Sequence, residues 1–252
     1  LKERTDKILA EKAAQAEKIS DLVDVAFAVD IFSDITAKDV QKTVFEKGDN
    51  VYEIRYEAPK FTDEALVTIS VTENENGEFI LTDISISDSD YIDSVLGISV
   101  NDGISTVKES VYTGPELIEV AIAETVTEIE DNAFDCKIET VTLRYGNESK
   151  NIGFDAFGDH GPESLDVISS NPEQTTIYLS ESMNDTRNFQ NTDNITINGA
   201  SAKEICLLFA KPYITIYLLS FAFIYPLLRL ILIELTNGCL QLGNIHPLPF
   251  RF

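Results

Sequence analysis

Apolar residues recur along the middle of the chain with a period in the low twenties. In the stretch 117–136 they fall at Leu117, Val120, Ile122, Val126, Ile129, Ala133 and Phe134. A backward shift of 22 residues places each of them on another apolar residue between 95 and 112, and a forward shift of 21 to 23 residues reaches a matching set between 138 and 157. A repeat of this length predicts a solenoid, in which each rung supplies a short strand and a return segment.

Each predicted rung presents one face to its neighbours and one to solvent. The strands are expected at 98–100, 120–122 and 141–143, and the return segments close on Tyr112, Phe134 and Phe157. A single rung cannot bury its own apolar face, so we expect the rungs to stack with the aromatic residues in one column. Between the buried positions the side chains of a strand point outward. The expected outward residues are Ser99, Glu119, Ala121, Thr140, Thr142 and Arg144.

The region before the repeats predicts helices and a small sheet. Residues 1–32 carry apolar side chains at three- and four-residue steps, which indicates a long amphipathic helix. A second, shorter helix is expected at 37–46, because Thr36 can cap its start and Gly48 follows its end. Alternating apolar residues then predict an antiparallel sheet that packs against the long helix. Its strands are expected at 51–56, 66–71 and 79–86.

The last of these strands has a second interpretation. Leu81, Ile84 and Ile86 have the same spacing as Leu117, Val120 and Ile122, so the segment also fits a capping first rung of the solenoid. After residue 160 the pattern weakens. Leu165 and Ile168 keep the first spacing, and segments 176–179 and 195–197 resemble further strands, so we expect irregular terminal rungs over 161–200.

These elements predict an α+β chain in three regions. Residues 1–90 hold the helix and the small sheet, 91–200 the solenoid, and 201–252 a hydrophobic tail. Within the tail, 205–235 is mostly apolar and 212–228 carries no charge, which is close to the shortest length that spans a bilayer. Two interpretations stay open: a membrane anchor, or a stretch that is not native protein because of a change of reading frame.

Charge narrows the class of partner. The chain has 43 acidic and 19 basic residues, a net charge of −24, and 44% hydrophobic residues. The hydrophobic content is sufficient for a packed core, whereas the charge argues against nucleic acid or an anionic membrane surface as an electrostatic partner. The tail has a small positive balance, so the acidity belongs to residues 1–200.

The residue types that carry chemistry are few and scattered. Cys136, Cys206 and Cys239 lack the close spacing of a zinc site or a disulfide framework. His160 and His246 have no recognisable nucleophile motif nearby, and neither a P-loop nor a dinucleotide-binding glycine motif is present. We expect no enzyme, no cofactor and no metal.

Two further signals are weak. The acidic run 88–93 offers oxygen ligands for calcium but lacks the glycine and the terminal glutamate of an EF-hand loop, so we interpret it as an acidic loop. Asn147, Asn184 and Asn194 begin glycosylation sequons, which matter only in a secreted eukaryotic chain.

The form L-x-x-V-x-I-x-x-x-V-x-x-I-x-x-x-A-F-x-x-C at 117–136 resembles the BspA-type leucine-rich repeat, and Ala156-Phe157 repeats its Ala-Phe element. The match covers about 95–160. It departs from the family where alanine or asparagine replaces the usual proline after the strand, and where Val111-Tyr112 replaces Ala-Phe. The resemblance implies a secreted or surface-displayed protein, since some members bind host proteins or neighbouring cells.

The first helix is similar to the amphipathic second half of the N-terminal helix of type IV pilin-like proteins, which is rich in Ala, Lys and Glu. This resemblance implies an apolar, membrane-inserted half upstream. The chain begins at Leu1 instead of methionine, so we expect either that a segment was removed or that the sequence is a fragment.

The hypothesis is therefore a non-enzymatic, extracellular or surface protein. In this hypothesis the solenoid binds a protein or glycan on a host or neighbouring cell, in the manner of an adhesin, and 205–235 is an optional membrane anchor. The alternative is a subunit of a pilin-like filament or secretion system that displays the repeats as a head.

Overall fold

The computed structural model of the chain describes residues 2–28, 34–87, 92, 95–159, 161–172, 174–175, 188–189 and 191–201. The chain divides into two compact units, 1–199 and 200–252. The only described element of the second unit is the two-residue strand β14 (Ala200–Ser201).

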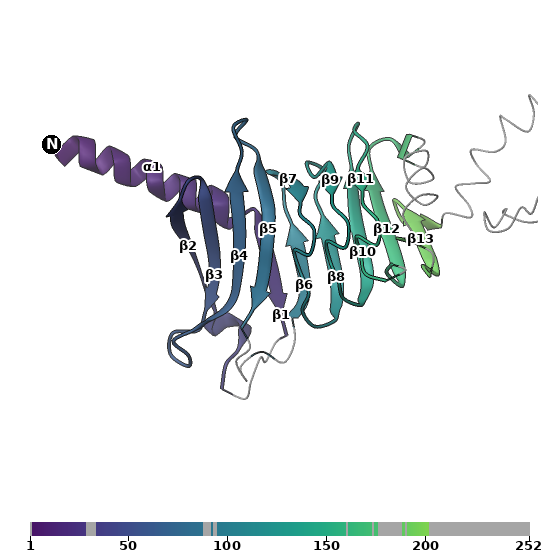
Figure 1. The fold of residues 1–252 in the computed structure, drawn as a ribbon, viewed down its shortest axis with the longest axis horizontal. Helices are drawn as coiled ribbons and strands as arrows, with labels where there is room; N and C mark the ends of the chain where they lie inside the picture. Colours follow the sequence, from purple (N-terminus) through teal and green to yellow (C-terminus); the bar gives the residue numbers. More distant parts are fainter. Residues whose placement is uncertain are drawn as a thin grey trace, which may run out of the picture. The chain divides into compact units, whose positions relative to one another are not determined.

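One helix precedes a succession of strands that form a β-solenoid of about four turns (Figure 1). In chain order the elements are α1 (Lys2–Ser20), β1 (Val23–Phe27), a 3-10 turn η1 (Ala37–Asp39), β2 (Gln41–Gly48), β3 (Val51–Glu57), β4 (Ala65–Glu73), β5 (Phe79–Ile86), β6 (Val95–Val100), β7 (Ile104–Val107), β8 (Leu117–Ile122), β9 (Glu128–Ile129), β10 (Ile138–Tyr145), β11 (Asn151–Ile152), β12 (Ser164–Ser169) and β13 (Asn194–Ile197).

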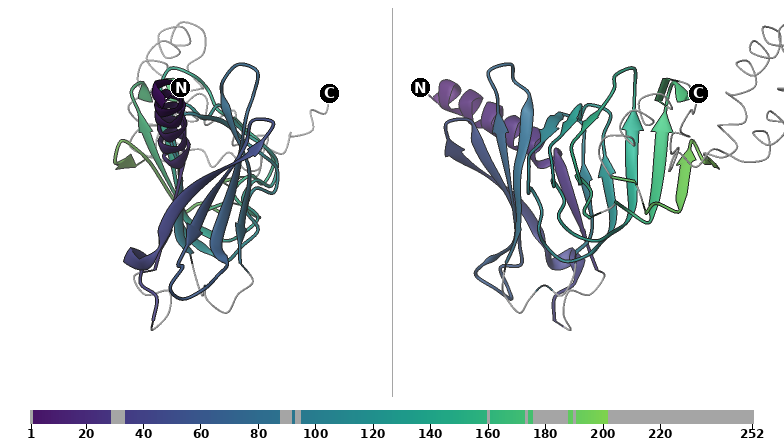
Figure 2. Two further views of the ribbon diagram at one scale, coloured as in Figure 1. Left: turned by 90° about the vertical axis from the view of Figure 1, so that its left-hand side faces the viewer. Right: turned by 45° about the vertical axis from the view of Figure 1, so that its right-hand side comes forward.

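Two sheets build this unit. The first sheet has the order β1-β6-β8-β10-β12-β13, with β1 antiparallel to β6 and the remaining strands parallel. The second sheet has the order β11-β9-β7-β5-β4-β3-β2, so an antiparallel meander, β2 to β5, continues into the parallel return strands of the solenoid. The right-hand view in Figure 2 shows the rungs stacked side by side beyond this meander. The strands of the predicted regions 1–90 and 91–200 thus share hydrogen-bonded sheets, and the predicted domain division stays a prediction.

The register confirms the period of the repeats. Val120 pairs with Ile98 on one side and with Val141 on the other, which are the shifts of 22 and 21 residues that the apolar pattern gives. The return strands repeat this arrangement, because Ile129 pairs with Val107 and Ile152. Each paired position is apolar and almost fully buried, so a stack of rungs places the columns of the two sheets against each other as one core.

The aromatic residues form the predicted column. Tyr112, Phe134 and Phe157 are each at most 1% exposed. The rings of Phe134 and Phe157 stack at 6.1 Å between centroids with 9° between their planes, and Phe189 continues the column at 6.2 Å from Phe157. Offset stacking adds to the gain from burying these rings. The residue two positions before each of the first three aromatics, at 110, 132 and 155, has a positive φ near 50°, which turns the corner of the rung.

The N-terminal strand caps the first sheet. β1 occupies its edge, where unpaired peptide groups would otherwise invite another chain. Its outer edge is satisfied by side chains of the meander. The Tyr56 hydroxyl accepts from the Val25 amide at 3.1 Å and donates to the Val23 carbonyl at 3.2 Å, and the Lys42 ammonium donates to the same carbonyl at 2.9 Å. Burial raises the pKa of Tyr56, so this hydroxyl stays protonated as a donor.

The predicted helix over 1–32 is wrong in its second part. The helix ends at Ser20, and 23–27 forms β1. Leu22, Ala26 and Phe27 have helical spacing, whereas Val23 and Val25 alternate as in a strand. Pairing of these two valines with Val100 and Ile98 of β6 favours the strand. The predicted packing also holds only in part, because Ile19 is the single buried residue of α1 among those described.

The predicted helix at 37–46 is also wrong. Thr36 does begin a capping box with Asp39, but the turn it starts is three residues long, and Gln41–Gly48 continues as the edge strand β2. Hydrogen bonds to β3 outweigh the weak helix preference of this segment. The strands predicted at 51–56, 66–71 and 79–86 are confirmed as β3, β4 and β5.

The structure corrects the ends of the solenoid. β5 does join the stack, but it pairs with the return strand β7 in the second sheet and not with the first-sheet strands whose spacing it shares. At the other end β12 and β13 continue the first sheet in parallel register. Leu165 aligns with Val141, so Ile168 aligns with Arg144 and is 44% exposed instead of buried. Segment 176–179 lies outside the described residues.

The hydrophobic tail, including 205–235, also lies outside the described residues. Among the residues that the structure does describe, no helix combines the length and the apolar character that crossing a membrane requires.

Candidate binding face of the solenoid

The outer face of the first sheet is the surface on which the predicted contact residues meet. Parallel register places equivalent residues of successive strands side by side across the sheet. The first column contains Gly97, Glu119, Thr140, Ser164 and Asn194. The second column contains Ser99, Ala121, Thr142, Asp166 and Thr196. We refer to these two columns together as the strand face.

The structure brings all six predicted outward residues to this side of the sheet. Glu119 and Arg144 are exposed, and Ser99, Ala121 and Thr140 are partly exposed. Thr142 is the exception at 8% exposure, because its hydroxyl donates to the Glu119 carboxylate at 3.0 Å and lies under it. The prediction of their direction follows from the two-residue alternation of a strand.

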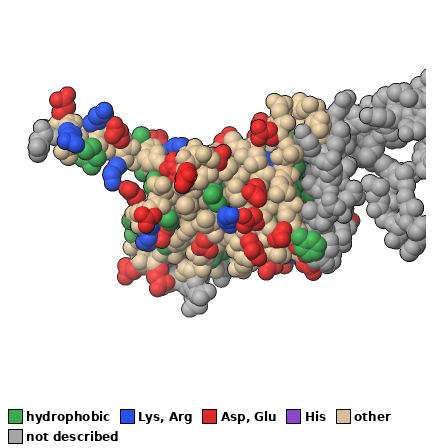
Figure 3. Space-filling model, turned by 45° about the horizontal axis from the view of Figure 1, so that its top comes forward, with side chains coloured by type: hydrophobic (Ala, Val, Ile, Leu, Met, Phe, Trp, Pro, Cys, Tyr) green, Lys and Arg blue, Asp and Glu red, His purple; other side chains and the backbone are tan. Residues whose placement is uncertain are grey.

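Small hydroxyl and amide side chains make up most of the strand face, and the Glu119 and Asp166 carboxylates lie among them. Asp166 accepts a hydrogen bond from the Thr196 hydroxyl at 2.7 Å, in the same way that Glu119 accepts from Thr142. Beside the two columns, Ile168 of β12 aligns with Arg144 and is 44% exposed. Figure 3 shows that acidic side chains are scattered over the body of the protein, with few basic ones between them. The face therefore offers carboxylates, hydroxyls and isolated aliphatic side chains.

Among the described contacts, the strand face has a single ion-paired basic group, which lies at the edge formed by β1. Asp24 of β1 pairs with Ser99 in the register, so it extends the second column. The Lys42 ammonium lies 2.5 Å from the Asp24 carboxylate. The Asp24 carboxylate is thus ion-paired, whereas no ion pair is found for Glu119 or Asp166 among the described residues.

The return side of the rungs is held by side chains. The Lys150 ammonium is buried and donates to the carbonyls of Ala123, Glu124 and Val126 in the preceding rung. It also lies 5.2 Å from the centre of the Tyr145 ring. Burial lowers the pKa of Lys150 to about 8, with the Glu124 carboxylate opposing the shift. Lys150 is enclosed by protein atoms, so we assign it to the stability of the stack.

The remaining candidates for chemistry do not assemble into a site in the described part of the chain. No group of three or more His, Cys, Asp and Glu side chains suited to a metal ion is found there. Cys136 is partly buried, and burial raises the pKa of its thiol to about 12, which suppresses the reactive thiolate. His160, His246, Cys206 and Cys239 lie outside the described residues, as does the 88–93 run apart from Ile92.

The glycosylation sequons that the structure describes are accessible. Asn147 lies on an exposed bend between β10 and β11, and Asn194 is exposed at the start of β13. Asn184 lies outside the described residues.

A groove beside α1 was not anticipated by the sequence pattern. It encloses about 670 Å³ and is lined by one face of the helix and by β2 and β3. Ile8, Ala13, Ala16, Val44 and Tyr52 supply its apolar lining. Ile8 is 45% exposed and Leu9, beside it, is 60% exposed. The Lys12 ammonium bridges the groove to Glu46 at 3.0 Å.

Comparison with known proteins does not identify the chain. No family model, no curated protein and no solved structure matches it.

Proposed function

We propose that this chain is a non-enzymatic binding protein of the cell surface or the extracellular space, which contacts a protein or glycan through the strand face. The observation that carries the proposal is the register of the five parallel strands, which lines up two columns of mostly accessible residues with only two side-chain hydrogen bonds between neighbouring strands. A regular, rigid surface of this kind is how solenoid proteins present extended binding sites.

The chemistry of the face suggests what it would bind. Glu119 and Asp166 offer carboxylates without an ion pair in the described structure, and Ile168 beside them offers an apolar contact. A complementary partner presents basic or hydroxyl groups among small apolar ones. Such a partner belongs to the surface of a host or neighbouring cell, and the tail 205–235 is a candidate anchor for displaying the solenoid there.

The kinship that we propose for the solenoid is the BspA-type leucine-rich repeat. The Ala-Phe element at 133–134 and 156–157 supports it, because both phenylalanines lie in the buried column that closes each rung. The β-solenoid itself is compatible with other repeat families, so this assignment rests on the repeat pattern in the sequence.

The test is a binding assay with the full chain. The probes are immobilised extracellular-matrix protein and mucin-type glycan, measured by biolayer interferometry against a blank surface. We expect saturable binding to at least one probe and about a tenfold or greater loss for Glu119→Lys. The matched control is Glu128→Lys, which makes the same charge change at an exposed position of β9 in the other sheet. Absence of binding to every probe, or equal losses for both variants, contradicts the proposal.

A second candidate function, assembly into a pilin-like filament, is favoured by α1. Residues 2–14 are exposed along their whole length, including Ile8 and Leu9. Figure 2 shows the start of the helix extending beyond the meander. An isolated helix of this length is marginal in water, so its exposed part would gain stability by packing against another copy or a partner. The groove beside α1 provides an apolar surface for that contact.

Self-association separates this candidate from the first. The measurement is sedimentation velocity of the full chain across a concentration series. Filament assembly predicts larger species at high concentration, and a shift to the monomer for the Ile8→Glu, Leu9→Glu double variant. A strictly monomeric chain with unchanged binding to the immobilised probes favours the first candidate alone.

A further inference from the structure

The second sheet contains a notch where one strand loses its neighbour. β5 pairs with β4 as far as Ile86, which lies opposite Val67. On its other side β5 pairs with β7 only over its first residues, and the last backbone bond is from the Ile84 amide to the Val111 carbonyl at 2.7 Å. Beyond it, no backbone hydrogen bond joins β5 to the segment 112–115 among the described residues. Within the described part of the chain, the end of β5 is therefore a short open edge inside a sheet.

The alternation of a strand fixes which peptide groups face this notch. The Ser87 amide donates to the Leu66 carbonyl of β4 at 3.0 Å, and Ser85 pairs with Thr68 of the same strand. The peptide groups of the alternate residues therefore point the other way. The Ile84 carbonyl and both peptide groups of Ile86 face the notch. Unpaired groups of this kind template the addition of another strand.

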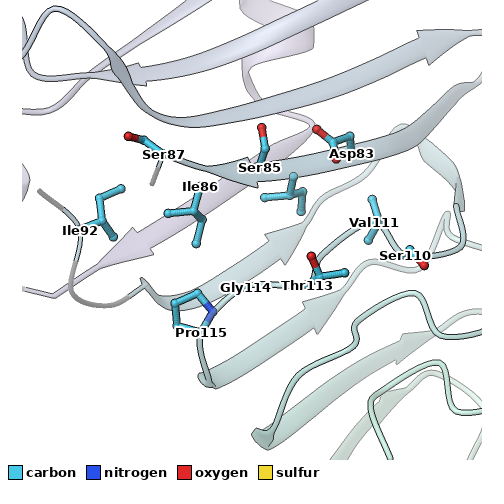
Figure 4. A pocket seen from close by; sticks show the side chains of 11 residues that line it. Asp83, Ser85, Ile86, Ser87, Ile92, Ser110, Val111, Thr113, Gly114 and Pro115 are labelled. Carbon is cyan, nitrogen blue, oxygen red and sulfur yellow. The ribbon is translucent and has the colours of Figure 1, made fainter. Parts of the chain in front are cut away.

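The notch opens into a pocket of about 430 Å³, which Figure 4 shows between β5 and the segment 110–115. The volume lies in the range of ordinary ligand sites. The wall opposite β5, formed by the segment 110–115, is fixed by a hydrogen bond from the Tyr112 hydroxyl to the Pro115 carbonyl at 3.0 Å. A Cβ on Gly114 would lie 2.6 Å from that ring, so only glycine fits there. A wall fixed in advance lowers the ordering cost of binding.

The two faces of β5 differ in chemistry at the notch. Figure 4 shows Ile86 pointing to one side of the strand, with Val111 and Pro115 beside the same opening, whereas Asp83, Ser85 and Ser87 point to the other side. A strand added to an edge shares the pleat of its neighbour. Its side chains would alternate between an apolar environment and a polar one that contains a carboxylate.

Asp83 supplies the charge on the polar side. No ion pair involves it among the described residues, and no basic group perturbs it. Its side chain is exposed at the tip, but neighbouring atoms displace water, and this desolvation raises the pKa of the carboxyl group in spite of a hydrogen bond from Ser85. A cation placed opposite would restore the solvation that the carboxylate has lost.

We propose that this notch binds an extended peptide segment of a partner protein, in which apolar residues alternate with basic or hydroxyl residues. The peptide main chain pairs with the free groups of Ile84 and Ile86, its apolar side chains contact Val111 and Pro115, and a basic side chain faces Asp83. At about 3.3 Å per residue, three residues extend over about 10 Å, so the contact is a short one. The inference goes beyond the proposed function, because the notch is in the other sheet and does not depend on the strand face.

The probe is the peptide acetyl-Thr-Val-Lys-Val-Thr-amide, added to the isotope-labelled full chain and followed by amide shifts in proton–nitrogen NMR spectra. We expect saturable shifts confined to 83–86 and 111–114. The same peptide with Glu in place of Lys should bind about tenfold more weakly or worse. A version methylated on its three central amide nitrogens, which cannot donate to β5, should not bind.

Variants of the protein complete the test. Asp83→Asn should reduce the preference for Lys over Glu to about threefold or less, with the spectrum of the folded protein otherwise unchanged. The matched control is Asp166→Asn on the strand face, which should keep the full preference. The inference is overturned by an absence of shifts at 84–86 up to about 1 mM peptide, by equal binding of the Lys and Glu peptides, or by binding of the methylated peptide. None of these results bears on binding through the strand face.

Discussion

The two sheets of the solenoid are held together in different ways. In the first sheet, strands of four to eight residues pair through the backbone, and their outer side chains contribute two short bonds between neighbours. On the return side the strands β9 and β11 are two residues long. The gaps are filled by the aromatic column, by the buried Lys150 and by the Lys108–Glu130 pair.

The difference separates stability from recognition. Where backbone hydrogen bonds hold the strands together, the outer side chains are free to vary, which is what a binding surface requires. Where side chains hold the rungs together, substitution of those side chains should destabilise the fold. The predictions below test that separation, beginning with the largest expected effect.

Phe134→Ala should have the largest effect, because it opens a cavity in the middle of the aromatic column. The ring is fully buried, and removing such a ring destabilises by about 3–5 kcal/mol. Urea denaturation of the full chain measures the change in unfolding free energy. A loss below about 1 kcal/mol would show that the column is not packed as described.

Lys150 should make stability depend on pH. Its pKa is about 8 in the fold and 10.5 in the unfolded chain. Between these values the unfolded state binds more protons at this group, so Lys150 by itself raises the unfolding free energy by about 2 kcal/mol from pH 7.5 to pH 9.5. The raised pKa of the Cys136 thiol acts in the opposite direction in both proteins, so the comparison of the two isolates the Lys150 contribution. Urea denaturation at the two pH values measures the rise, and Lys150→Met should remove it. An equal rise in both proteins would assign the effect to another group.

Breaking the Lys108–Glu130 pair should have a smaller effect. Both side chains are partly exposed, and a pair in that setting is worth about 0.5–1 kcal/mol. The Glu130 carboxylate also accepts from the Glu109 amide at 3.0 Å, so the rung corner keeps one bond in Lys108→Met. The measurement is the urea midpoint at low and high salt. The deficit of the variant should shrink at high salt, and an unchanged deficit contradicts an electrostatic origin.

Glu119→Gln on the strand face should have the smallest effect. The side chain is exposed, and glutamine can still accept from the Thr142 hydroxyl, so we expect a change within about 0.5 kcal/mol. The same urea experiment applies. A loss of unfolding free energy comparable to that of Phe134→Ala would mean that the outer side chains also hold the strands together. The strand face would then not be free for recognition.

The sequence predicted the solenoid because its physics is local and repeated. Each rung must bury the same face against its neighbour, so Val120, Ile129 and Phe134 recur at matching positions, and the register follows. The direction of the strand-face residues follows from the same alternation. The secondary-structure prediction failed for the segment 21–48. Its short apolar runs fit both the helix and the strand period, and pairing with strands distant in sequence determines which one forms.

The sites outside the strand face were not predictable in the same way. The notch depends on where β7 stops pairing with β5, and Gly114-Pro115 marks a turn without indicating which strand loses its neighbour there. The groove beside α1 depends on β2 as its second wall, and the sequence pattern predicted a helix over most of that segment. The exposed Asp83 looked like one acidic residue among many, and only its position beside an open edge makes it informative.

The register of the first sheet is the claim on which the strand face depends, and cross-linking tests it most directly. Ala121 and Thr142 are partners on adjacent strands, about 4.8 Å apart, within reach of a disulfide. Ala121 and Arg144 are offset by two more residues, about 8 Å apart, beyond that reach.

The measurement is the yield of disulfide after mild oxidation of the two double-cysteine variants of the full chain, with the link located by tandem mass spectrometry of tryptic peptides. The account predicts a high yield for Ala121→Cys with Thr142→Cys and little or none for Ala121→Cys with Arg144→Cys. The reverse order, or equal yields, would contradict the stacked register and the strand face built on it.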